Sequence, residues 1–245
     1  MSGSERFDVV IVGGAAVGSA AAYFLAGAPG FDGRLLVLEQ DPSYQHCATA
    51  LSVASVRHQF STPENIRMSM FGSAFFAEAG QRLAVDGQAP DLGWRDGGYL
   101  FLATAPGLPV LQANHATQRA EGAQVQLLDA AALQQRFPWL HCSDLAGGSL
   151  GQRGEGWLDA YSLMAALRRK AQSLGAEYRP ARVQRLLRQG RRIVGVDLAD
   201  GSHIGCDMVI NAAGTGAAAL ARSAGMELPV DVAETEENLN LEPQP

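Results

Sequence analysis

The residues best suited to chemistry are glycines near the N-terminus, in the pattern G-x-A-x-x-G. Gly13, Ala15 and Gly18 make the pattern, and Gly14 lies inside it. Glycine permits turns too tight for a side chain, and a helix that begins at such a turn offers unpaired N–H groups and a positive dipole end to an anion. The spacing predicts a site for the pyrophosphate of a dinucleotide, with an alanine where a middle glycine is usual.

A strand and a helix must position this loop, and a second strand adds a carboxylate. Residues 9–12 are continuously apolar, as a strand buried on both faces requires, and an Ala-rich stretch with helical spacing follows. Residues 34–39 form a second such run, which ends in Glu39, 21 residues beyond Gly18. A carboxylate there can accept both ribose hydroxyls of an adenosine and repels a 2′-phosphate. The alternative is an ordinary strand-helix-strand unit with a surface glutamate.

Two later segments also suit a ligand. Residues 48–60 are small and hydroxylated and contain one arginine, Arg57, which favours backbone wrapped against a flat ligand. The apolar run 203–214 ends in Asn-Ala-Ala-Gly, which leaves room at the carboxyl end of a strand, where α/β sheets bind cofactors. The alternatives are an arginine paired with a structural carboxylate and small residues chosen for packing.

Composition excludes several classes of partner. The chain has 245 residues, 47% of them hydrophobic, and a net charge of −6, so we expect a globular protein with no affinity for nucleic acid or an anionic membrane. The basic clusters 168–170 and 191–192 are interpreted as a solvated helix face and a hairpin turn. The glycine break in the uncharged stretch 9–28 argues against a membrane span, and the N-terminus has no signal-peptide pattern, so a cytoplasmic location is predicted. Three cysteines and five histidines lack metal-ligand spacing, and no metal is predicted.

The chain is predicted to be an α/β protein with an insertion. Helices are expected at 63–79, 110–121, 130–137 and 160–174, and strands at 94–103, 125–128, 183–187, 192–198 and 203–214. Because the block 92–147 does not continue the strand-helix-strand pattern, it is predicted to be an α+β insertion between the two parts, 1–91 and 148–229, of a dinucleotide-binding domain. Residues 231–245 contain five acids and no base, so 230–245 is predicted to be a disordered tail.

Several of these segments together resemble the FAD-dependent oxidoreductases of the D-amino-acid oxidase and sarcosine oxidase type. The resemblance covers roughly residues 7–230 and depends on VVIVGGAAVGSAAAYFLA with Glu39, RHQF, LDAAALQQRFPWL, GWLDAYSL and DGSHIGCDMVINAAG. The segments DPSYQ, TALS, VRHQFS and PENI are most similar to the subgroup that contains the mitochondrial complex I assembly flavoprotein. The resemblance implies a Rossmann-type, glutathione-reductase-like FAD-binding domain with an incomplete substrate domain.

The resemblance also implies roles for particular residues. It places the FAD pyrophosphate at the glycine loop, the adenosine ribose at Glu39 with Gln40, and the adenine at the backbone of Val183. Thr49, Ser52, Ala213 and Gly214 are expected to lie near the cofactor. Arg57 is expected to bind a substrate carboxylate, and the adjacent His58 is a second catalytic candidate.

The implied reaction is oxidation of the C–N bond of a small amino acid or N-methylated amine by hydride transfer to flavin. Two alternatives stay open: a flavin-binding assembly or interaction protein with little turnover, and an NAD-dependent dehydrogenase. Because members of the family continue well beyond residue 230, the chain is expected to be an incomplete version of the fold that retains FAD weakly. A completing or electron-accepting protein partner is therefore also expected.

Overall fold

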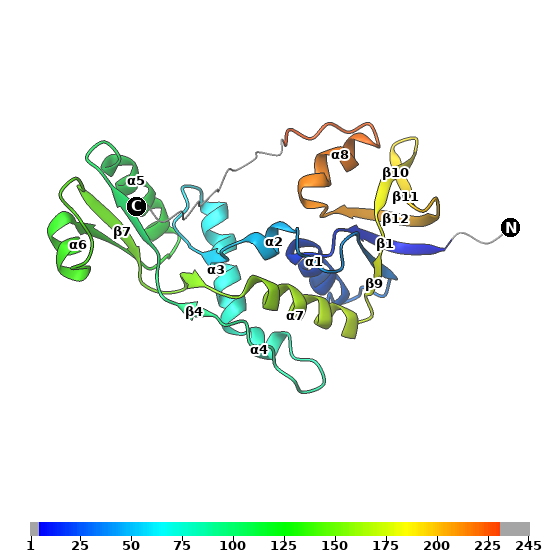
Figure 1. The fold of residues 1–245 in the computed structure, drawn as a ribbon, viewed down its shortest axis with the longest axis horizontal. Coiled ribbons are helices and arrows are strands. Elements are labelled where there is room, and N and C mark those ends of the chain that lie inside the picture. The colour runs from blue at the N-terminus through cyan, green and yellow to red at the C-terminus, as the bar shows by residue number, and fades with distance from the viewer. Residues whose placement is uncertain (1–4, 231–245) are drawn as a thin grey trace, which may run out of the picture.

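The computed structural model describes residues 5–230 and shows two sheets at opposite ends of an elongated molecule (Figure 1). The helices are α1 (Ala16–Ala26), α2 (Ala48–Leu51), α3 (Pro63–Ala77), α4 (Ala79–Arg82), α5 (Leu108–Ala120), α6 (Ala130–Arg136), α7 (Ala160–Ser173) and α8 (Ala217–Arg222), with a short 3-10 turn at Gly214–Gly216. The predicted tail, from residue 231 on, lies outside the described residues.

The larger sheet has six strands in the order β10-β11-β12-β1-β2-β9. Their bounds are β1 (Arg6–Val12), β2 (Leu35–Glu39), β9 (Glu177–Pro180), β10 (Val183–Gln189), β11 (Arg192–Leu198) and β12 (His203–Asn211). The pairs β12-β1, β1-β2 and β2-β9 are parallel, whereas β10, β11 and β12 are antiparallel neighbours. This mixed sheet with its helices confirms the predicted α/β class.

Burial explains the continuous apolar runs of β1 and β2. Val10 and Leu36 pack on one face of the sheet with Leu220 of α8. Ile11 and Val37 pack on the other face, with Ala22 of α1 and Ala171 of α7. Since successive side chains of a strand point to opposite faces, a strand covered on both faces must be apolar throughout.

The second sheet is antiparallel, in the order β5-β7-β6, with bounds β5 (Leu100–Ala103), β7 (Gly147–Gly151) and β6 (Val125–Asp129). A third, small sheet has the order β3-β8-β4, with bounds β3 (Ser55–Val56), β8 (Gly156–Trp157) and β4 (Arg95–Asp96). The predicted boundary at residue 147 falls at the start of β7, which pairs with both β5 and β6. The second sheet therefore continues past that boundary to Gly151.

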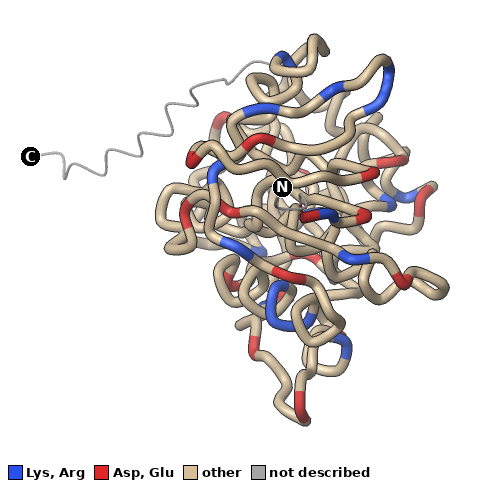
Figure 2. The backbone as a smooth tube through the Cα atoms, turned by 90° about the vertical axis from the view of Figure 1, so that its right-hand side faces the viewer, with Lys and Arg blue, Asp and Glu red and all other residues tan. Residues whose placement is uncertain are grey.

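Charge is mixed over the view in Figure 2, where basic and acidic residues are interspersed. Among the described residues, no helix is long and apolar enough to span a membrane, and no three His, Cys, Asp or Glu side chains are grouped as metal ligands would be.

Candidate functional site

The loop between β1 and α1 requires glycine at two positions. Gly13 has φ +97°, and a Cβ built on it would lie 2.3 Å from the backbone oxygen of Ala212. A Cβ on Gly18 would lie 1.8 Å from the oxygen of Gly13. Both contacts are with backbone, which cannot rotate away, so the loop, the end of β12 and the first turn of α1 are held in close approach.

The start of α1 is open to an anion. Its N-cap is Ala15, which has no side chain to bond the first helical N–H groups, and the first turn has no acidic residue. Thr49 of α2 lies beside this turn, with its Oγ1 accepting from the Ala16 N–H at 3.3 Å. A helix start that is uncapped by its own N-cap residue, with a positive dipole end, suits a pyrophosphate.

Glu39 is fixed at the carboxyl end of β2 by two backbone donors. Its Oε2 accepts from the Gly14 N–H at 2.7 Å, and its Oε1 accepts from the Asp41 N–H at 2.8 Å. Each carboxylate oxygen retains further lone pairs, so the side chain is oriented without being saturated. The carboxylate and the uncapped helix thus border the same loop.

The other residues expected near a cofactor occupy different settings. Ala213 and Gly214 follow β12, and Asn211 holds this turn by accepting from the Ala213 N–H and donating to Ala217. The chain entering β10 at Val183 passes the end of β2, since the Ala181 N–H donates to the backbone carbonyl oxygen of Glu39 at 2.8 Å. Gln40 and Ser52 are exposed, and the Ser52 Oγ accepts locally from the Ala54 N–H.

Arg57 directly follows β3 and lies among aromatic rings. Its guanidinium carbon is 5.0 Å from the Phe60 ring centroid, 5.7 Å from Tyr99 and 5.6 Å from Phe101. Its Nε is buried and has no hydrogen-bond partner among the described residues. A buried guanidinium N–H without an acceptor is costly, and a ligand carboxylate would supply the missing acceptor.

Buried polar contacts hold the two residues that follow Arg57 in the chain, His58 and Gln59. Buried Glu155 accepts from the His58 N–H at 2.6 Å and from the Gln59 side-chain amide at 2.8 Å, and burial raises the Glu155 pKa. The His58 Nε2 is 2.6 Å from the Ser73 Oγ. These contacts occupy His58 inside the protein, and its predicted catalytic role stays a prediction. Glu155 carries no motif that could have identified it, because its partners are about 100 residues away in the chain.

Burial lowers the pKa of His58, and this gives a testable dependence of stability on pH. The folded chain then holds this proton less tightly than the unfolded chain, so His58 makes folding less favourable as the pH falls below its ordinary value of about 6.5. We expect His58→Gln to be destabilising at about pH 7.5 and to lose part of that deficit at about pH 5.5. Urea unfolding of the parent and the variant at each pH measures this difference in the free energy of unfolding. The raised pKa of Glu155 makes folding more favourable as the pH falls, but Glu155 is present in both proteins, so its contribution cancels in the difference. An equal deficit at the two pH values would contradict the burial argument.

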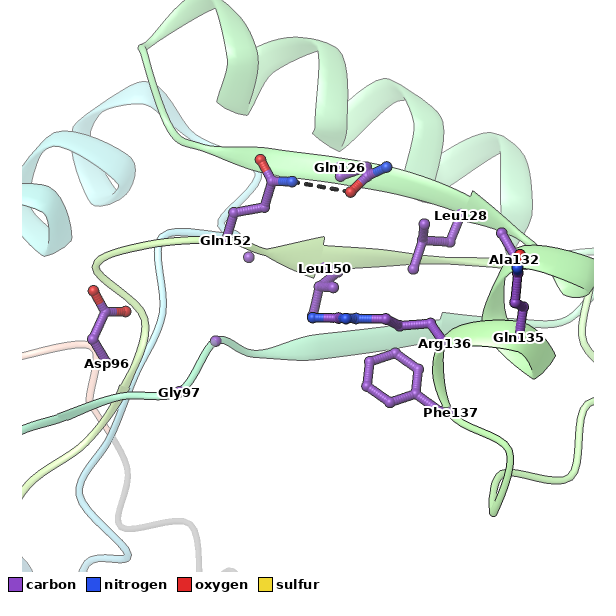
Figure 3. Close-up of a pocket in the computed structure, with 12 residues that line it drawn as sticks. Asp96, Gly97, Gln126, Leu128, Ala132, Gln135, Arg136, Phe137, Leu150 and Gln152 are labelled. Atoms are coloured by element: carbon purple, nitrogen blue, oxygen red, sulfur yellow. Dashed lines mark hydrogen bonds between the residues drawn. The ribbon is translucent and has the colours of Figure 1, made fainter.

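A hollow of the molecule lies elsewhere, against the second sheet (Figure 3). It has a volume of about 800 Å³ and is bordered by Leu150, Arg136 and the hydrogen-bonded pair Gln126 and Gln152. Its lining includes no residue of the glycine loop.

Comparison with known proteins identifies the family. The family model described as FAD dependent oxidoreductase (DAO) matches residues 8–244. The chain belongs to the FAD-dependent oxidoreductase family. This confirms the resemblance found in the sequence and identifies FAD as the cofactor.

Among individual relatives, FAD-dependent oxidoreductase domain-containing protein 1 of Bos taurus is 37% identical over 243 residues, which cover 91% of this chain and 50% of the relative. The 4-methylaminobutanoate oxidase (formaldehyde-forming) of Paenarthrobacter nicotinovorans is 29% identical over 231 residues, 92% of this chain and 26% of that enzyme. The crystal structure of glycine oxidase from Geobacillus kaustophilus has a TM-score of 0.76 and 25% identity, covering 92% of this chain and 60% of that one. This family member therefore spans about half the length of the Bos taurus relative.

The residues present fit the adenosine diphosphate part of FAD. Because Gly13 and Gly18 have no Cβ, a phosphate can approach the backbone of the loop closely. The start of α1 offers N–H donors to that phosphate. Glu39 offers a fixed carboxylate to ribose hydroxyls. The N–H donors of the loop thus suit the diphosphate, and the Glu39 carboxylate at the end of β2 suits the ribose.

Proposed function

We propose that this chain binds FAD and orients the carboxylate of a small amino acid or N-methylated amino acid whose C–N bond is oxidised. The observation that carries the proposal is Arg57, whose half-buried guanidinium lies among three aromatic rings and whose Nε has no hydrogen-bond partner within residues 5–230. The names of two family relatives, a glycine oxidase and a 4-methylaminobutanoate oxidase, support this substrate class.

The chain's own residues would bind and orient the substrate. The planar guanidinium of Arg57 can hold a carboxylate through two parallel N–H donors, which fixes direction as well as position. The rings of Phe60, Tyr99 and Phe101 exclude water around the pair and strengthen it. FAD, when bound, supplies the acceptor for the hydride.

A direct test is anaerobic reduction of the FAD-loaded chain by candidate substrates. Glycine, N-methylglycine, proline and 4-methylaminobutanoate are compared with methylamine, which lacks the carboxylate. We expect loss of flavin absorbance with at least one amino acid and none with methylamine. If FAD is bound but no compound reduces it, the alternative of a flavin-binding assembly or interaction protein is favoured instead. The NAD-dependent alternative is disfavoured by the family assignment.

Arg57→Lys tests the role of the arginine separately. Lysine keeps the charge but lacks the planar fork, so we expect the amino-acid concentration for half-maximal flavin reduction to rise about tenfold. Arg67→Lys is the matched control, because Arg67 on α3 forms a surface pair with Glu121 at 2.6 Å. An unchanged half-maximal concentration in Arg57→Lys would remove Arg57 from the substrate site.

The cytoplasmic location and the protein partner also stay predictions. The feature that favours a partner is the second sheet, in which β5 and β6 each pair with β7 alone among the described strands. An outer strand presents backbone donors and acceptors that another strand can pair with. Size-exclusion chromatography with light scattering would show whether the chain associates.

A further inference from the structure

Arg168 on α7 lies over two tyrosines, contrary to the solvated helix face predicted for residues 168–170. Its guanidinium carbon is 5.7 Å from the Tyr44 ring centroid and 5.2 Å from the Tyr178 ring centroid. Its Nη1 is also 3.4 Å from the Tyr44 Oη. The neighbouring Arg169 is exposed, with its Nη2 3.4 Å from the Gln88 oxygen. The structure therefore separates two adjacent arginines, one half-buried over aromatic rings and one at the surface.

Tyr44 connects Arg168 to the glycine loop. It is 3% exposed and has φ +57°, a left-handed conformation that bulky residues rarely adopt and that surrounding contacts must hold. A Cβ built on Gly14 would lie 3.0 Å from the Tyr44 Oη and 3.3 Å from the Glu39 Cβ. Gly14, Tyr44 and Glu39 are therefore packed together, and a shift of Tyr44 would open space beside both others.

Tyr178 reaches the same glycine by a second path. Its hydroxyl donates to the Ser19 Oγ at 3.2 Å, and the fully buried Ser19 hydroxyl donates to the Gly14 carbonyl oxygen at 2.6 Å. Arg168 thus contacts the first residue of both paths, and both paths end at Gly14. The contacts therefore form a closed ring that begins at Arg168 and meets at Gly14.

This ring fixes the direction of a backbone donor. In a trans peptide the C=O of one residue and the N–H of the next point in opposite directions, and no described peptide is cis. Holding the Gly14 carbonyl toward buried Ser19 therefore turns the Ala15 N–H the other way, at the uncapped start of α1. The Gly14 N–H is meanwhile held by Glu39.

We propose that Arg168 is a positioning residue for FAD, which acts through Tyr44 and Tyr178 to hold the Gly14 peptide and Glu39 in the orientation that binds the diphosphate and ribose. The role goes beyond the proposed oxidation, since it concerns retention of the cofactor whatever the substrate. A purely structural role for Arg168 would change the stability of the protein without FAD and leave the affinity of the folded protein unchanged.

The test is FAD affinity of Arg168→Met, which keeps an unbranched apolar stem and removes the charge and the donor. Arg169→Met is the control on the same helix. We expect Arg168→Met and Tyr44→Phe each to weaken FAD binding about tenfold, and Arg169→Met less than about twofold, by flavin fluorescence titration. Combining Arg168→Met with Tyr44→Phe should weaken binding by less than the product of the single effects, because both break one network.

Two results would overturn the proposal. One is an FAD affinity of Arg168→Met equal to that of Arg169→Met. The other is a loss of affinity explained fully by a smaller folded fraction, measured by circular dichroism at the temperature of the titration. ADP titration gives the same comparison without the flavin ring. Since neither titration involves an amine, failure here is distinct from failure to reduce the flavin with amino acids.

Discussion

Replacing Gly13 with alanine is expected to lower the free energy of unfolding by about 4 kcal/mol or more and to abolish FAD binding. Two costs add at this position. Alanine at φ +97° is strained, and its Cβ would lie 2.3 Å from the Ala212 oxygen, a backbone atom that can move only with β12. The loop would have to shift away from the end of β12, which would displace the N–H groups offered to the diphosphate.

Gly30→Ala separates the two costs. Gly30 has φ +83°, but nothing lies within 4 Å of a Cβ built there. Gly30→Ala should therefore lower the free energy of unfolding only by the conformational cost of a positive φ, about 1 to 2 kcal/mol. Urea unfolding of the three proteins gives the comparison. Equal destabilisation by the two substitutions would mean that the close approach of Gly13 to β12 is absent in solution.

Replacing Glu39 with glutamine is expected to weaken FAD binding by about ten- to a hundredfold. A hydrogen bond to a charged group contributes about 1.5 to 3 kcal/mol, and a factor of ten in affinity corresponds to about 1.4 kcal/mol. The amide also has one acceptor oxygen, so it cannot serve both the Gly14 and Asp41 N–H groups as the carboxylate does. The substitution therefore loosens the loop and also removes the charged acceptor offered to the ribose hydroxyls.

Glu78→Gln provides the matched control for this charge change. Glu78 is exposed and forms a surface pair with Arg82, so the substitution should leave FAD affinity within about twofold of the parent. Isothermal titration with FAD measures all three proteins. If Glu39→Gln and Glu78→Gln bind FAD equally, the ribose does not contact Glu39.

The nucleotide part of the fold could be predicted because its signals are local. Apolar runs at β1 and β2 report burial on both faces, and the glycines report backbone contacts that no side chain permits. The helix beginning at Ala130 was identified from Asp129, whose carboxylate does accept from the Ala132 N–H at 2.7 Å. Glu39 was predicted from its distance in sequence beyond the glycines, and its carboxylate does lie at the loop, where it accepts from the Gly14 N–H. Its contact with a ribose stays a prediction.

The contacts that orient the site could not be predicted, because residues far apart in sequence make them. Arg168 sits in a basic cluster that looks solvent-facing, and only the packing of α7 beside α2 and β9 brings it over Tyr44 and Tyr178. Glu155 was missed for the same reason. The short strand β7 was also missed, since three of its five residues are glycine and carry no apolar signal.

The most direct test of the account is competition among nucleotides for the purified chain in equilibrium dialysis. If the loop, the start of α1 and Glu39 bind the adenosine diphosphate half of FAD, as we propose, the chain should retain FAD, release it to excess ADP and not retain FMN, which lacks that half. Retention of FMN equal to that of FAD, or FAD binding that excess ADP leaves unchanged, would contradict the assignment of this site.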